Sequence, residues 1–256
     1  ALFALCATTP LSADIIRVAV ASNFAPALRA LQSDFERVSG HSLSLSTGSS
    51  GSHYAQIRQG APYAVFLAAD AQRPGLLEEE GFAVAGSRFT YALGRLVLWV
   101  PDSGSSRGDA NKAASDPLLE QPGALPATRL AIANPRLAPY GAAAEAYLRH
   151  EGLWAALQPR LVMGENVGQA FQFVASGAVP SGLVALSQLR VLERQGVTVP
   201  QDEFTVIDPA LYPQIRQQAV LLIDSPAAHE FLAWLKSAQV RTELIGFGYD
   251  MPHAEH

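Results

Sequence analysis

Short apolar strands alternate with amphipathic helices along this chain, and polar turns join each strand to the helix that follows. The β-branched run 15–21 ends at Ser22-Asn23, which is expected to cap the next helix. The strand at 43–45 leads in the same way through the serine-rich turn 47–52. Repeated β-α-β units predict a parallel sheet with these turns at the carboxyl ends of its strands. The apolar face of the first helix should comprise Leu28, Leu31, Phe35 and Val38.

The same units return in the second half of the chain, which indicates two lobes. A length of 256 residues exceeds the ~100–200 residues of a typical domain. Polar turns at 138–141 and 164–167 again separate strands from helices, and 102–116 is expected to be an exposed loop. We expect an α/β fold with two lobes, each a mostly parallel sheet flanked by helices, and a hinge of crossing strands. The expected division is 14–93 plus 221–256 for the first lobe and 94–220 for the second, with a ligand cleft between them.

The composition excludes some classes of protein. The chain is 49% hydrophobic and 16% charged, which suits a packed core and argues against disorder. Its net charge of −5 gives no electrostatic footprint for nucleic acid. An acidic protein that binds an anion must rely on local donors, because its overall field repels the ligand.

Residues 1–13 are apolar and end in Leu-Ser-Ala, which is typical of the end of a secretory signal peptide. This predicts export, with Ala13 as the last residue of the leader. The single cysteine, Cys6, lies in this segment and is either removed with it or lipidated, although the bulky Leu5 before it disfavours lipidation. The alternative is a buried N-terminal strand or helix.

Four turns combine a strand end with a helix start: Ser22-Asn23, Ser49-Ser50, Pro139-Tyr140-Gly141 and Asn166-Val167. The first N–H groups of a helix have no intrahelical partner and carry partial positive charge, so they bind anions. Neither serine-rich turn contains Lys or Arg. The four turns therefore favour a site between the lobes that holds an oxyanion by neutral donors, the alternative being four ordinary helix caps.

Several short motifs occur in an order that resembles the molybdate-binding proteins of bacterial molybdate ABC importers. They include Val-Ala-Ser-Asn-Phe at 20–24, Gly-Ser-Ser-Gly at 48–51, the run 60–70, Ala-Pro-Tyr-Gly at 138–141 and Phe-Gly-Tyr at 247–249. The resemblance implies a type II periplasmic binding protein that captures molybdate or tungstate. It implies delivery to a membrane permease by hinge closure, with no catalysis, no cofactor, no metal except in the bound oxyanion, and a monomeric state.

The resemblance also implies the ligand contacts. Hydroxyls would come from two serines and a tyrosine, the asparagine would add to the first turn, and the valine would contribute its N–H alone. These residues are Ser22, Asn23, Ser50, Tyr140 and Val167. Ala185 stands where some members have a tyrosine, so Tyr140 is expected to replace it. Ala64 stands where the family usually has Asp, which affects a supporting position.

Other functions stay open at this stage. Sulfate, thiosulfate or another tetrahedral oxyanion would suit the same fold. Ser50 and His53 suggest a serine hydrolase, but Ser52 breaks the G-x-S-x-G pattern, and His53 is read as a solvated helix residue. An amino-acid ligand would need an arginine such as Arg58 or Arg136, and both are predicted to be exposed. The six histidines are too scattered to indicate a site for a metal cation.

Overall fold

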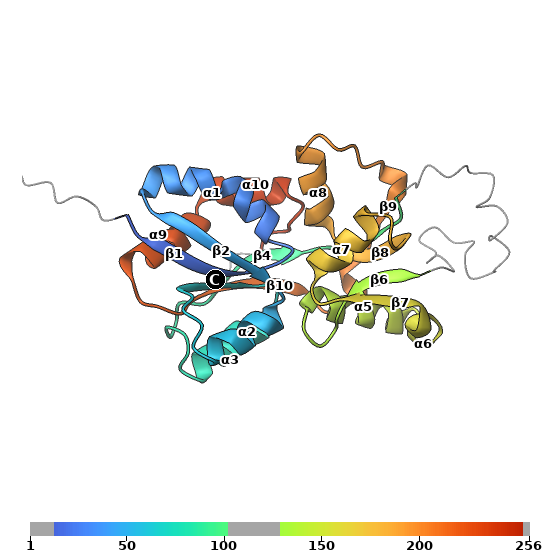
Figure 1. Cartoon of the computed structure of the whole chain (residues 1–256), viewed down its shortest axis with the longest axis horizontal. Coiled ribbons are helices and arrows are strands. Elements are labelled where there is room, and N and C mark those ends of the chain that lie inside the picture. Colours follow the sequence, from blue (N-terminus) through green and yellow to red (C-terminus); the bar gives the residue numbers. More distant parts are fainter. Residues whose placement is uncertain (1–12, 102–128, 253–256) are drawn as a thin grey trace, which may run out of the picture.

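The computed structural model describes residues 13–101 and 129–252 and forms two lobes side by side (Figure 1). The expectations for the leader at 1–13, save Ala13, and for the whole of the loop at 102–116 fall outside these ranges. Each lobe is built around one five-stranded sheet. Within the described ranges, no helix is both long and apolar enough to cross a membrane.

The sheet of the first lobe has the strand order β2-β1-β3-β10-β4. The strands β2, β1 and β3 are parallel, and β10 runs antiparallel between β3 and β4. Their bounds are β1 (Ile15–Ala21), β2 (Ser42–Gly48), β3 (Val65–Ala68), β4 (Phe89–Gly94) and β10 (Ile215–Leu221).

The sheet of the second lobe repeats this plan in the order β7-β6-β8-β5-β9. The strands β7, β6 and β8 are parallel, and β5 runs antiparallel between β8 and β9. Their bounds are β5 (Leu96–Trp99), β6 (Leu130–Ala133), β7 (Leu161–Gly164), β8 (Ser181–Ala185) and β9 (Phe204–Val206). The mostly parallel two-lobed fold expected from the sequence is confirmed.

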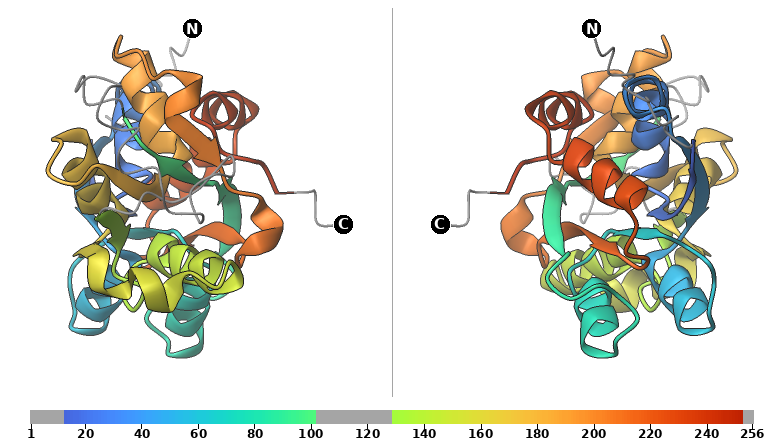
Figure 2. Two further views of the ribbon diagram at one scale, coloured as in Figure 1. Left: turned by 90° about the vertical axis from the view of Figure 1, so that its right-hand side faces the viewer. Right: turned by 90° about the vertical axis from the view of Figure 1, so that its left-hand side faces the viewer.

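Helices cover both faces of the first sheet, because alternate residues of its central strands are apolar on both sides. Val18 and Val20 of β1 pack with α1, α9 and α10, whereas Ala19 faces the core beneath α2 and α3. Figures 1 and 2 show these two layers on opposite sides of the sheet. The helices are α1 (Ala25–Ser39), α2 (Ser50–Arg58), α3 (Gln72–Glu79), α9 (Pro226–Leu235) and α10 (Ala238–Gly246).

The second lobe has its own core between its sheet and its helices. Its helices are α5 (Pro139–His150), α6 (Trp154–Leu157), α7 (Val167–Ala175) and α8 (Leu186–Arg194), with short 3-10 turns η2 (Gln158–Arg160), η3 (Gln201–Glu203) and η4 (Pro209–Leu211). Helix α8 also approaches α1 of the first lobe. The lobes are therefore joined by packed helices as well as by the chain.

The chain crosses between the lobes twice in the described ranges, from β4 to β5 and from β9 to β10. The first crossing lies next to the expected boundary at 93/94. The second lies before Ile215, so β10 belongs to the first sheet, although the sequence division placed nearly all of it in the second lobe. The apolar run of β10 did not reveal which sheet it would join.

Two details of the first helix differ from expectation. Val38 is 62% exposed, because the apolar face of α1 ends with Phe35. The N-cap of α1 is Phe24, with no side-chain cap bond, rather than Ser22 or Asn23. The polar side chains of that turn have partners elsewhere in the molecule, as described below.

Candidate functional site

One small cavity lies where turns from both lobes meet. Its volume is about 10 Å³, which is room for the centre of one water molecule. None of the residues that line it is charged. All four turns singled out in the sequence contribute to this lining. The lining residues are Ala21, Ser22, Asn23, Gly48, Ser49, Ser50, Ala69, Ala138, Pro139, Tyr140, Asn166 and Val167.

The first three backbone N–H groups of α2 differ in their hydrogen-bond partners. The N-cap side chain of Ser49 accepts a hydrogen bond from the N–H of Ser52 at 3.1 Å. The N–H of Gly51 donates to the carbonyl of Leu137, in the second lobe, at 2.9 Å. The N–H of Ser50, at position N1, has no partner among the described residues and lies at the cavity. One donor is therefore left for a ligand.

Helix α7 in the second lobe repeats this arrangement. The N-cap side chain of Asn166 accepts from the N–H of Gln169 at 3.0 Å. The N–H of Gly168 donates to the Oγ of Ser22, in the first lobe, at 3.1 Å. The N–H of Val167, at position N1, is the one without a partner in the part of the chain that the structure describes.

Helix α5 supplies a third donor by a different route. Pro139 at its first position has no N–H, and the N–H of Gly141 bonds to the carbonyl of Ala138 at 2.9 Å. The N–H of Tyr140 lies between them without a partner among residues 13–101 and 129–252. Three helix starts thus each leave one N–H at the same cavity, and their dipoles make it favourable for an anion.

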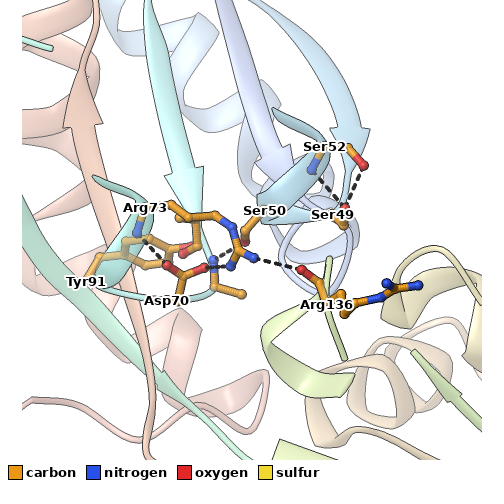
Figure 3. A network of polar contacts seen from close by, with 9 residues as sticks. Ser49, Ser50, Ser52, Asp70, Arg73, Tyr91 and Arg136 are labelled. Carbon is orange, nitrogen blue, oxygen red and sulfur yellow. Dashed lines mark hydrogen bonds and ion pairs between the residues drawn. The ribbon is translucent and has the colours of Figure 1, made fainter. Parts of the chain in front are cut away.

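The two serine hydroxyls at the cavity are buried and already act as acceptors. The Oγ of Ser50 accepts from the N–H of Ala69 at 2.9 Å, and the Oγ of Ser22 accepts from the N–H of Gly168 at 3.1 Å. Ser50 lies at the start of α2 in Figure 3. Because a hydroxyl carries one proton of its own, each serine retains that proton for a further acceptor.

Tyr140 brings a third hydroxyl to the boundary between the lobes. Its side chain is 1% exposed, and its hydroxyl has no hydrogen-bond partner among the described residues. The hydroxyl lies against Gly94, where a Cβ atom would clash with it. Burial, followed by nearby tyrosines, raises the pKa of Tyr140 well above its usual 10, so the phenol stays protonated. Ala185 is fully buried at the end of β8 and has no polar group to offer from its side chain.

Asn23 lines the cavity, but its side chain points into a polar network within the first lobe. Its Nδ2 donates to Gln217 Oε1 at 3.0 Å and to the Tyr249 hydroxyl at 3.2 Å. Tyr91 donates to the same Gln217 oxygen at 3.1 Å. The carbonyl of Asn23 accepts from Tyr249 and, across the cleft, from the Ser187 hydroxyl at 3.3 Å. The side-chain donors of Asn23 are therefore used to fix the turn.

The arginines near the site are neutralised or exposed. Arg73 pairs with Asp70 at 2.7 Å, and its second terminal nitrogen donates to the carbonyl of Arg136 at 3.3 Å (Figure 3). The side chain of Arg58 is 51% exposed, and Arg136 is exposed as well, which confirms the prediction for both residues. None of the described residues that line the cavity has a cationic side chain that could bind a carboxylate.

His53 is buried, at 1% exposure, so its interpretation as a solvated residue was wrong. Its Nε2 lies 3.2 Å from the carbonyl of Val20 and its Nδ1 lies 3.3 Å from Gln56 Oε1. Burial lowers the pKa of His53 below 6.5. The Ser50 hydroxyl bonds to a backbone N–H rather than to this imidazole, so the pair lacks the contact of a nucleophile with its base.

Several residues of this site were not identified from the sequence. Gly51 and Gly168 bridge the lobes, Gly94 makes room for Tyr140, and Gln217 holds the first turn. Their partners are 86, 146, 46 and 194 residues away along the chain, so no local pattern could reveal them. In the described part of the chain no three His, Cys, Asp or Glu residues are grouped as metal ligands.

The fold and the site define a class of protein. Residues 16–250 match the family model described as bacterial extracellular solute-binding protein, and the chain belongs to this family. Its members are binding components of transport systems rather than enzymes, so the hydrolase alternative is not supported.

Particular relatives narrow the comparison. The molybdate-binding protein ModA of Azotobacter vinelandii is 41% identical over 245 residues, covering 92% of this chain and 90% of that protein. The ModA of Rhodobacter capsulatus is 40% identical over 246 residues, covering 94% and 90%. The solved structure of the Azotobacter vinelandii periplasmic molybdate-binding protein matches with a TM-score of 0.79 and 36% identity, over 93% of this chain and 100% of that one.

Proposed function

We propose that this chain binds molybdate or tungstate and delivers it to the membrane permease of an ABC importer. The observation that carries the proposal is the convergence of three unpaired helix N–H groups and two serine protons on one cavity without charged residues. The relatives at 40% identity or more are named for molybdate binding and support the choice of ligand.

The proposed contacts are all donors. The N–H groups of Ser50, Tyr140 and Val167 and the hydroxyls of Ser22 and Ser50 favour an anion that can accept hydrogen bonds on every side. The Tyr140 hydroxyl, which has no partner among the described residues, is proposed to join them when the ligand binds. Asn23 contributes through the position of its backbone, because its side-chain donors are used within the first lobe. Burying a dianion without compensation is costly. Several aligned dipoles together offset this cost, whereas a single donor would not.

The same set of donors selects among anions. Molybdate and tungstate carry no proton at neutral pH, whereas hydrogen phosphate would direct its proton at other donors. Sulfate is also unprotonated but smaller, so it would meet fewer donors at hydrogen-bonding distance. The alternative is a general site for sulfate, thiosulfate or a similar oxyanion. Only the size of the anion that fits the cavity distinguishes this alternative from the proposed molybdate site.

Isothermal titration of the purified chain with molybdate, tungstate, sulfate and phosphate tests the proposal. We expect one tight site for molybdate and tungstate, with sulfate and phosphate much weaker. Equal affinity for sulfate would move the function to general oxyanion uptake. Absence of heat with every oxyanion would refute an oxyanion site.

Location and assembly follow from the same proposal. We propose that the protein works in the periplasm as a monomer and exchanges its ligand with the permease in the closed form. The family description and the periplasmic relative support the location. Sedimentation of the purified chain with and without molybdate would test the monomer, and a dimer in either condition would contradict it.

A further inference from the structure

Two glycines, Gly51 and Gly168, occupy equivalent positions in the two lobes. Each is the second residue of its helix, directly after the residue whose N–H is left for the ligand. Each donates its own N–H across the cleft, Gly51 to the carbonyl of Leu137 at 2.9 Å and Gly168 to the Oγ of Ser22 at 3.1 Å. The contacts run in opposite directions, one from each lobe to the other.

Backbone conformation does not explain why these residues are glycines. Neither has a positive φ, unlike the eight described glycines that do, so an L-residue fits the local backbone. The space above them explains it. A Cβ at Gly51 would lie 2.8 Å from the carbonyl oxygen of Leu137. A Cβ at Gly168 would lie 3.0 Å from the Oδ1 of Asn166, in its own lobe, and 3.1 Å from the Cβ of Ser22, in the opposite lobe. At both positions an atom of the opposite lobe lies within 3.1 Å of the added Cβ.

We propose that Gly51 and Gly168 are positioning residues that form a reciprocal latch between the lobes and set how far the cleft closes on its ligand. The inference rests on the proposed function, since the ligand is the anion assigned there. Opening the cleft would separate both contacts. Closing it brings the N–H of Gly51 to the carbonyl of Leu137 and the N–H of Gly168 to the hydroxyl of Ser22, and the absence of a side chain at both glycines leaves room for these approaches.

The latch also orients a ligand donor. When Gly168 donates to the Oγ of Ser22, that oxygen serves as an acceptor, and its proton is directed elsewhere. Ser22 and Asn166 line both the small cavity and a groove of about 890 Å³ beside it. The Ser22–Gly168 contact therefore lies at the wall between the ligand site and this groove, and weakening it should speed the release of the anion.

The test compares Gly51→Ala and Gly168→Ala with Gly75→Ala as the matched control. A Cβ at Gly75, in α3, would meet only the guanidinium of Arg88, at 3.9 Å and within the same lobe. We expect Gly51→Ala to raise the molybdate dissociation constant roughly 10-fold, with a smaller rise for Gly168→Ala, where a side chain rather than the backbone must shift. The rise should come from faster dissociation in stopped-flow competition, while Gly75→Ala behaves as the wild type.

A merely structural role would give a different result. The latch predicts an unchanged melting temperature for both ligand-free variants and a larger radius of gyration in solution scattering with molybdate bound. Wild-type dissociation rates, or a ligand-free melting temperature that falls in step with affinity, would overturn it. A wild-type chain that does not bind molybdate would refute the proposed function instead. In that case, solution scattering of the ligand-free proteins would test the latch. A larger radius of gyration for the two variants than for the wild type would support it, and identical scattering curves would overturn it.

Discussion

The two lobes present the same helix start to the cavity, yet they differ in what the side chains add. In α2 and α7 the N-cap side chain holds the third N–H, a glycine donates the second across the cleft, and the first is left free. The first lobe adds the hydroxyls of Ser22 and Ser50, whereas α7 adds only the apolar Val167. The backbone of either lobe can hold an anion. Substituting side chains, however, can remove more of the donors to the anion in the first lobe than in α7.

The largest effect should follow Ser50→Ala in the first lobe. The change removes a donor to the anion and leaves the N–H of Ala69 unpaired in a buried place, so affinity for molybdate should fall roughly 10- to 100-fold. Calorimetry measures this change in affinity. Ser52→Ala is the control, because among the described residues the Ser52 hydroxyl has only that of Ser49 as a hydrogen-bond partner. Equal affinities for wild type and Ser50→Ala would remove the difference between the lobes.

Tyr140→Phe tests the hydroxyl of the second lobe that we propose to contact the anion. We expect about a 10-fold loss of affinity, since one donor is lost without exposing a partner. The ligand-free protein should be as stable as the wild type or more so, because a buried unpaired hydroxyl is removed. Tyr147→Phe on the same helix serves as the control. Unaltered binding would leave only the backbone of this turn in the site.

Val167→Ala should leave affinity within about 2-fold of the wild type, because the proposed contact is the N–H alone. Stability should still fall by about 2 kcal/mol, since two buried methyl groups are lost. Val174→Ala, also buried in α7, should cost a similar amount. Urea unfolding and calorimetry separate the two effects, and a large loss of affinity at unchanged stability would contradict this division of roles.

The smallest effect on binding, and a clear one on stability, is expected at His53 beneath the serine turn. The folded pKa lies below 6.5, so in acid the unfolded chain takes up a proton before the folded one does. Stability from this residue is therefore complete above pH 6.5 and is lost as the pH falls towards the folded pKa, by at most about 1.4 kcal/mol per pH unit. His53→Gln should flatten the decline in stability that urea unfolding measures between pH 7 and 5, and an equal decline in the variant and the wild type would contradict this.

The alternation of strands and helices was predictable because each element carries its own apolar period. The start of α9 is an example, where Ser225 caps as its position before Pro226 suggests. The first turn was not predictable in the same way. Ser22 and Asn23 look like caps, but their side chains bond to Gly168 and Gln217, which lie far along the chain. Local chemistry places a polar turn correctly, whereas the partners of its side chains depend on how the lobes meet.

Because no described residue that lines the cavity is charged, the long-range field felt by an approaching dianion is set by the net charge of the whole protein, and the helix dipoles act only close to the site. With a net charge of −5, that field opposes the encounter. Dissolved salt screens such repulsion beyond about 10 Å at 0.1 M ionic strength. The rate of capture should therefore rise with ionic strength, the reverse of what an anion site built from lysine and arginine would show.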